Sequence, residues 1–67
     1  MIWTDINDIA GDLFDAEPGL NPLSLRFTDL RDKVMGLNNF EGSVENCNEK
    51  ILESIQMAWL EEFEDQD

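Results

Sequence analysis

The residues with the clearest chemical potential are the aspartates near the start of the chain. They lie at spacings of three, four and three, at Asp5, Asp8, Asp12 and Asp15. On a helix, these positions fall within about 80° of arc and form one acidic stripe. Carboxylate oxygens suit hard cations such as Mg²⁺, Ca²⁺ and Mn²⁺, and they also bind Fe²⁺ and Fe³⁺. The stripe predicts a weak metal site completed by water. The alternative is that these aspartates bind no metal and form a solvated helix face, which keeps a small protein soluble.

Tighter sites and catalysis are poorly supported by the residues present. Asp5 and Asn7 open like a calcium loop, but Ile9 stands at the next ligand position and Ala10 where the loop needs glycine. The chain has no histidine and a single cysteine, Cys47, which excludes zinc or iron–sulphur ligation by cysteine and histidine clusters. Cys47 also lacks an obvious base for nucleophilic catalysis. We therefore expect no enzymatic activity and no tightly bound cofactor.

The charge balance points to the kind of partner. The chain carries 16 acidic and 4 basic residues, for a net charge of −12. Such a field repels nucleic acids and anionic membranes, and it attracts cations or a basic protein surface. Arg26, Arg31 and Lys33 make residues 25–40 the only locally cationic stretch. A basic partner would relieve the mutual repulsion within the aspartate stripe, so protein docking is a second use for the same acids.

Length and cysteine content set the class of protein. The 67 residues form one domain, 1–67, whose small core supplies about 3–5 kcal/mol of net stability. Cys47 has no second cysteine to pair with, which favours a reducing compartment. No apolar run approaches the ~18 residues of a membrane span, and no secretory segment opens the chain. We expect a cytoplasmic monomer that does not bind membranes.

The helix that organises the domain is predicted over residues 48–63, which hold more large apolar side chains than any other segment. Its apolar stripe has helical spacing and consists of Ile51, Leu52, Ile55, Ala58, Trp59 and Phe63. Two starts are open: Asn48 can cap the helix directly, or Asn46 can cap it with Glu49 as the partner in a capping box. The other elements should pack against this helix.

Two shorter helices are predicted before it. The first has Thr4 as its N-cap and is ended by residues 17–19, Glu-Pro-Gly. The second covers residues 29–37, with Thr28 as its N-cap and Gly36 as an exit signal. Their apolar positions repeat at helical spacing, so each should present one face to the core.

The connecting segments have weaker signals. Residues 23–25 indicate a short helical turn after an Asn-Pro pair, and residues 25–27 alternate like a brief strand. Phe40 is expected to anchor the loop that leads to the final helix. The expected fold is therefore mainly α, with three helices and a minimal β element.

Five further side chains have roles that their residue type and position predict. Trp3 and Trp59 are predicted to be core residues. Met57 and Leu60 lie off the main stripe of the last helix, and we expect them to pack against a further element rather than form an exposed patch. Cys47 is expected to be inert, although a place at a helix start would lower the pKa of its thiol.

Several strings together resemble one known family. They are Trp3-Thr4-Asp5, Asp15-Ala16 with Pro18, Arg26-Phe27-Thr28-Asp29, Asn48-Glu49-Lys50-Ile51-Leu52-Glu53 and Trp59-Leu60. Over nearly its whole length the chain is similar to the IscX family, small acidic accessory proteins of bacterial iron–sulphur cluster assembly. The resemblance implies a small three-helix domain of modified winged-helix type with a minimal β element. It also implies binding to the cysteine desulfurase of the pathway, and weak iron binding by surface carboxylates.

The resulting hypothesis is a non-enzymatic adaptor or regulator of cluster assembly. The predicted metal ligands for weakly bound Fe²⁺ or Fe³⁺ are Asp5, Asp8, Asp12 and Asp15. The predicted partner-binding residues are Asp8, Asp12, Asp15, Glu17, Arg26 and Asp29. Besides the desulfurase, a ferredoxin or the scaffold protein is an expected partner, whereas nucleic acid is not, because the net charge of −12 opposes phosphate contacts. There are two alternatives. One is an iron carrier that supplies the scaffold, and the other is a generic acidic interaction module without a metal role.

Overall fold

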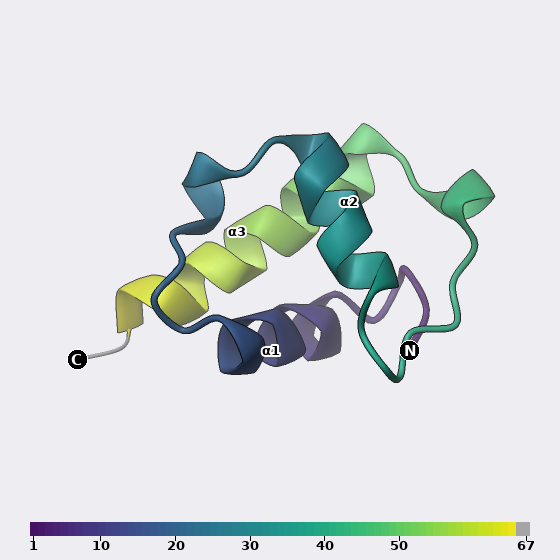
Figure 1. The fold of residues 1–67 in the computed structure, drawn as a ribbon. Coiled ribbons are helices and arrows are strands. Elements are labelled where there is room, and N and C mark those ends of the chain that lie inside the picture. Colours follow the sequence, from purple (N-terminus) through teal and green to yellow (C-terminus); the bar gives the residue numbers. More distant parts are fainter. Residues whose placement is uncertain (66–67) are drawn as a thin grey trace.

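The computed structural model describes residues 1–65 as three α-helices joined by irregular segments (Figure 1). The α-helices are α1 (Ile6–Ala16), α2 (Phe27–Met35) and α3 (Glu49–Asp65). Two 3₁₀ turns, η1 (Pro22–Ser24) and η2 (Val44–Asn46), lie in the connections. This confirms the mainly helical, three-helix prediction, including the short helical turn near Leu23. No helix in this part of the chain is long and apolar enough to cross a membrane.

The minimal β element is not found within residues 1–65. Leu25 and Arg26 do have extended backbone angles, with φ/ψ of −94°/145° and −78°/158°, but no neighbouring segment pairs with them as a strand. Phe27 already begins α2, so the alternation of residues 25–27 marks the entry to a helix. The winged-helix type is therefore not confirmed, because the described residues contain no strands from which a wing is built.

Two of the predicted N-cap residues, Thr4 and Thr28, are not at the N-cap positions of the structure. Asp5, rather than Thr4, occupies the N-cap position of α1. Arg26 holds that position in α2 without a side-chain cap, and Thr28 lies inside the first turn. At α3 the direct start is confirmed, because the Ile51 backbone N–H donates to Asn48 Oδ1 at 2.9 Å.

The core lies where all three helices meet, and α3 is its central element as predicted. The buried side chains of this core are Trp3, Ile9, Ala10, Leu13, Leu30, Val34, Leu52, Ile55 and Trp59, and Pro22 of η1 is buried as well. Both α1 and α2 pack against α3, and the Gln56 amide donates to the Pro22 carbonyl at 3.2 Å, which ties η1 to the same helix. The core assignment of Trp3 and Trp59 is confirmed. The packing prediction for Met57 is wrong, because that side chain is 50% exposed.

The first residues of the chain lie against the segment that follows α2, at one corner of the domain (Figure 1). The Trp3 ring meets the Phe40 ring edge-on, with centroids 4.7 Å apart, so Phe40 does anchor this segment. The Trp3 indole N–H donates to the Ser43 carbonyl at 2.6 Å. The Glu41 N–H donates to the Met1 carbonyl at 2.7 Å. These contacts hold two segments, about 40 residues apart, in one fixed arrangement.

Candidate functional site

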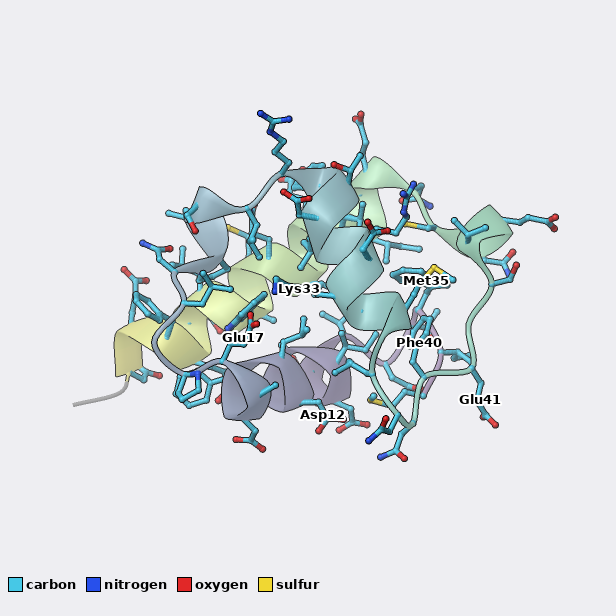
Figure 2. The ribbon with its side chains drawn as sticks, in the orientation of Figure 1. Asp12, Glu17, Lys33, Met35, Phe40 and Glu41 are labelled. Carbon is cyan, nitrogen blue, oxygen red and sulfur yellow. The ribbon has the colours of Figure 1, made fainter. Side chains whose placement is uncertain are left out.

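Helix α1 presents the candidate carboxylates because its other face is buried. Ile9, Ala10 and Leu13 point into the core, which leaves the positions between them toward solvent. Figure 2 shows Asp12 on the side of α1 that faces away from α2. The predicted acidic stripe is therefore an outer surface of the folded domain.

Asp5 has a structural task at the start of this helix. Its carboxylate accepts the Ile2 backbone N–H at 2.9 Å, and its own backbone N–H donates to the Ile2 carbonyl at 3.0 Å. This reciprocal pair closes the turn that leads into α1. Asp5 is half-buried, and its side chain is less available to a ligand than the sequence pattern indicates.

Asp8, Asp12 and Asp15 form the unpaired part of the stripe. Asp8 and Asp15 are exposed, and Asp12 is half-buried. None of them has a salt bridge or a side-chain hydrogen bond with any residue of the described part of the chain. Their negative charge is therefore balanced only by solvent and ions.

Glu17 is used inside the molecule. Lys33 Nζ lies 2.9 Å from one carboxylate oxygen of Glu17 and 3.0 Å from the other, and Figure 2 shows the two side chains pointing toward one another. The pair connects the end of α1 to α2. Both side chains remain about a third or more exposed, at 32% for Lys33 and 43% for Glu17. A partner that contacts Glu17 would therefore have to compete with Lys33.

Arg26 and Asp29 are separated from the stripe by the course of α2. Both lie at its first turn, and that end of the helix is remote from α1 (Figure 1). The opposite end of α2 approaches α1, as the Lys33–Glu17 pair shows. The structure therefore does not bring Arg26 and Asp29 together with Asp8, Asp12 and Asp15. A single small patch cannot contain all the predicted partner-binding residues.

The described carboxylates do not fit a resident metal. Among residues 1–65, no group of three or more acidic or cysteine side chains is arranged so that it could hold one ion. Ligands spaced along one exposed helix face leave most of the coordination shell to water. Iron binding by Asp5, Asp8, Asp12 and Asp15 stays a prediction, and iron would be a loosely held cargo there.

The structure adds carboxylates that the sequence pattern did not connect with α1. Glu61, Glu62 and Asp65 of α3 line a hollow of about 240 Å³ together with Asn7 and Ala10 of α1. This second acidic group lies at the seam between α1 and α3, on the Asn7 and Ala10 side of α1. The available sequence signal was a pair of small residues, Ala10 and Ala58, which allow the helices to approach closely there.

Cys47 is half-buried at the entry to α3. Burial raises the pKa of its thiol, and the nearby Arg31 guanidinium lowers it to a smaller extent. The lowered pKa considered from its place at a helix start is therefore wrong. The thiol stays protonated near neutral pH, which is not the state of a reactive nucleophile.

Comparison with known proteins identifies the family. A family model described as iron-sulphur cluster assembly matches residues 1–64. An uncharacterized protein of Pseudomonas aeruginosa is 42% identical over 60 residues, which cover 90% of this chain and 91% of that protein. The family match contains α1 and α2 and all of α3 but its last residue. The chain is therefore a member of the iron–sulphur cluster assembly family that its sequence resembles, the IscX family.

Proposed function

We propose that the protein is a non-enzymatic adaptor or regulator that docks on the cysteine desulfurase of the iron–sulphur assembly system through the outer face of α1. The single observation that carries this proposal is the unpaired state of Asp8, Asp12 and Asp15 within the described chain. Three carboxylates on one face, without any compensating cation, form a rigid negative surface. A basic patch on a partner is its physical complement.

Electrostatics supports fast and selective docking more than high affinity. Opposite potentials steer the encounter and disfavour wrong partners, while salt screens exposed charges over about 10 Å at 0.1 M and about 3 Å at 1 M. Glu61, Glu62 and Asp65 of α3 add negative charge at the seam with α1, on a different flank of that helix from the stripe. The proposed docking face is therefore the outer side of α1, and the α3 carboxylates strengthen the negative potential around it.

Iron enters this proposal as a cargo held by the same carboxylates. A bound Fe²⁺ or Fe³⁺ would neutralise part of the stripe and occupy the place of a basic side chain. Iron and the desulfurase would then weaken one another, and by linkage each would do so by the same factor. The iron carrier remains the alternative role, because it uses the same residues.

The docking proposal is tested by titrating the purified desulfurase with charge variants at 0.05–1 M salt. The test variant combines Asp8→Asn, Asp12→Asn and Asp15→Asn. The control changes the net charge equally at exposed sites elsewhere: Glu45→Gln, Glu53→Gln and Glu64→Gln. We expect the test variant to lose much more affinity and to flatten the salt dependence. Equal losses would show that only net charge matters, and an unchanged affinity would place the interface elsewhere.

A second assay separates the regulator from the carrier. Sulphide production by the desulfurase is measured with and without the protein over a range of iron concentrations. A regulator changes the rate of sulphide production in an iron-dependent manner. A carrier enhances cluster formation on the scaffold while sulphide production is unchanged.

A further inference from the structure

An apolar pocket lies beside the N-terminal end of the acidic face. Its volume is about 330 Å³, and its lining includes Ile2, Trp3, Thr4, Glu41, Gly42 and Ile51. Ile2 is 50% exposed although it is a large aliphatic side chain. The pocket therefore offers apolar surface to solvent on a protein that is otherwise dominated by charge.

The pocket is held in shape before any partner arrives. Trp3 is almost fully buried, with 3% exposed, and is fixed by its hydrogen bond to the Ser43 carbonyl and by its edge-on contact with Phe40. The backbone of Glu41 is tied to Met1 on the other side. A preformed pocket of this kind loses little conformational entropy when it is filled.

The pocket is continuous with the acidic stripe. Thr4 lines the pocket and also a second hollow, whose other lining residues include Asp5 and Asp8. Glu41 is the charged residue of the pocket lining, and Figure 2 shows it projecting outward from the segment after Phe40. The apolar lining therefore adjoins negative charge at Glu41 and, through Thr4, at the start of the α1 stripe.

We infer that this pocket and the acidic face form one two-part docking surface for a basic segment that carries a large apolar side chain. The apolar side chain enters the pocket beside Ile2 and Ile51. Neighbouring lysine or arginine residues of the same segment lie over Asp8 and Glu41, which are both exposed. The inference rests on the proposed function and adds to it the chemistry of the partner segment. A second copy of this chain is a poor occupant, because each copy carries −12.

The division of roles follows from how interfaces work. Exposed charge pairs contribute little to affinity, typically below about 1 kcal/mol each, whereas a buried apolar anchor in a pocket is a common centre of binding energy. The stripe on α1 would thus guide the partner, and the pocket would retain it. An acidic helix face alone lacks such an anchor.

The pocket is tested with two synthetic peptides that differ in one side chain. The first is acetyl-Lys-Arg-Leu-Lys-Arg-amide, and the second has serine in place of the leucine. Binding is followed by NMR through the indole N–H signals of Trp3, next to the pocket, and Trp59, in the core. We expect the leucine peptide to bind about tenfold more tightly and to shift the Trp3 signal, with little change at Trp59. Equal affinities, or an unmoved Trp3 signal, would overturn the inference.

Variants of the protein give the matched controls. Ile2→Ser should abolish the preference for the leucine peptide, whereas Ile2→Leu should retain it. Leu23→Ser removes a similarly exposed aliphatic side chain, 56% exposed, on η1, and it should leave the preference for the leucine peptide unchanged. A loss with Leu23→Ser as large as that with Ile2→Ser would refute the pocket as the site.

The desulfurase separates this inference from the proposed function. Ile2→Ser should weaken its binding about tenfold while leaving the salt dependence in place, because the charges remain. If the wild type binds the desulfurase and Ile2→Ser binds equally well, the anchor is refuted and the docking proposal stands. If the desulfurase does not bind while the leucine peptide is still preferred, the pocket stands and its assignment to the desulfurase fails.

Discussion

Gly42→Ala tests whether the corner formed by Trp3 and Phe40 is packed as tightly as the structure indicates. A methyl group at this position would lie 2.5 Å from Phe40 Cζ, 2.8 Å from Phe40 Cε2 and 2.9 Å from Trp3 Cδ1. All three separations are shorter than carbon atoms tolerate. The Phe40 ring would have to move, and the Trp3 ring is held by its hydrogen bond to the Ser43 carbonyl.

The size of the effect follows from the cost of overpacking. One extra methyl group in a well-packed site costs about 1–3 kcal/mol when neighbouring rings must shift. A domain of this size has roughly 3–5 kcal/mol of stability, so the loss would be a large fraction of the total. It corresponds to a fall in Tm of roughly 4–8 °C for each kcal/mol.

Gly19→Ala is the matched control. A methyl group there meets nothing within 4 Å, and no glycine of the described chain has a positive φ, so the same substitution should be neutral or stabilising by up to about 1 kcal/mol. Both variants are unfolded in urea, with helix content followed by circular dichroism and the Trp3 environment by fluorescence. If Gly42→Ala is as stable as Gly19→Ala, the corner between Trp3 and Phe40 is not tightly packed. Loss of the Trp3–Phe40 contact in Gly42→Ala would also diminish the preference for the leucine peptide.

Three further predictions concern the helices and the thiol. Gly11→Ala, in the interior of α1 with open space around it, should stabilise the protein by up to about 1 kcal/mol in urea unfolding, and a loss would reveal an unseen neighbour. Lys33→Gln should cost at most about 1 kcal/mol, because its ion pair with Glu17 is substantially exposed, and the difference from wild type should shrink in 1 M salt. Since folding raises the pKa of Cys47, the folded state holds its proton more tightly. This stabilisation is complete below the ordinary pKa of 9.0 and falls as pH rises through the folded value. At pH 8, alkylation of Cys47 should therefore be slower in the folded protein than in the protein unfolded in urea. Equal rates in the two states would contradict the burial of the thiol.

Much of the fold was predictable because three segments have clear helical periodicity. Apolar residues at helical spacing in each of the three segments, such as Ile9, Leu30 and Ile55, are buried in the structure. The caps were harder, because residue type alone cannot show where a side chain reaches. Thr4 is a good cap by type, yet the carboxylate of Asp5 accepts the Ile2 N–H and closes the turn one residue later.

The candidate site was predictable only where it lies on one element. The α1 stripe follows from spacing, so Asp8, Asp12 and Asp15 do share an outer face. The acidic hollow with α3, and the pocket beside Ile2, depend on which segments meet in space, and no local pattern contains that information. The strand expected at residues 25–27 failed for a related reason, since an extended segment becomes a strand only when another segment pairs with it.

The placement of the few cations explains why the acidic face is available to a partner. Of the four basic side chains, Lys33 pairs with Glu17 and Arg31 pairs with Asp32, at 3.3 Å, so neither reaches the α1 stripe. Arg26 lies at the remote end of α2, and Lys50 is exposed at the start of α3. The charge of the stripe therefore has no counterpart among residues 1–65, and relief of its repulsion must come from outside the molecule. A ligand that binds only the folded state stabilises it in proportion to the logarithm of its concentration. A basic partner or a bound cation should thus raise the stability of this domain as it docks.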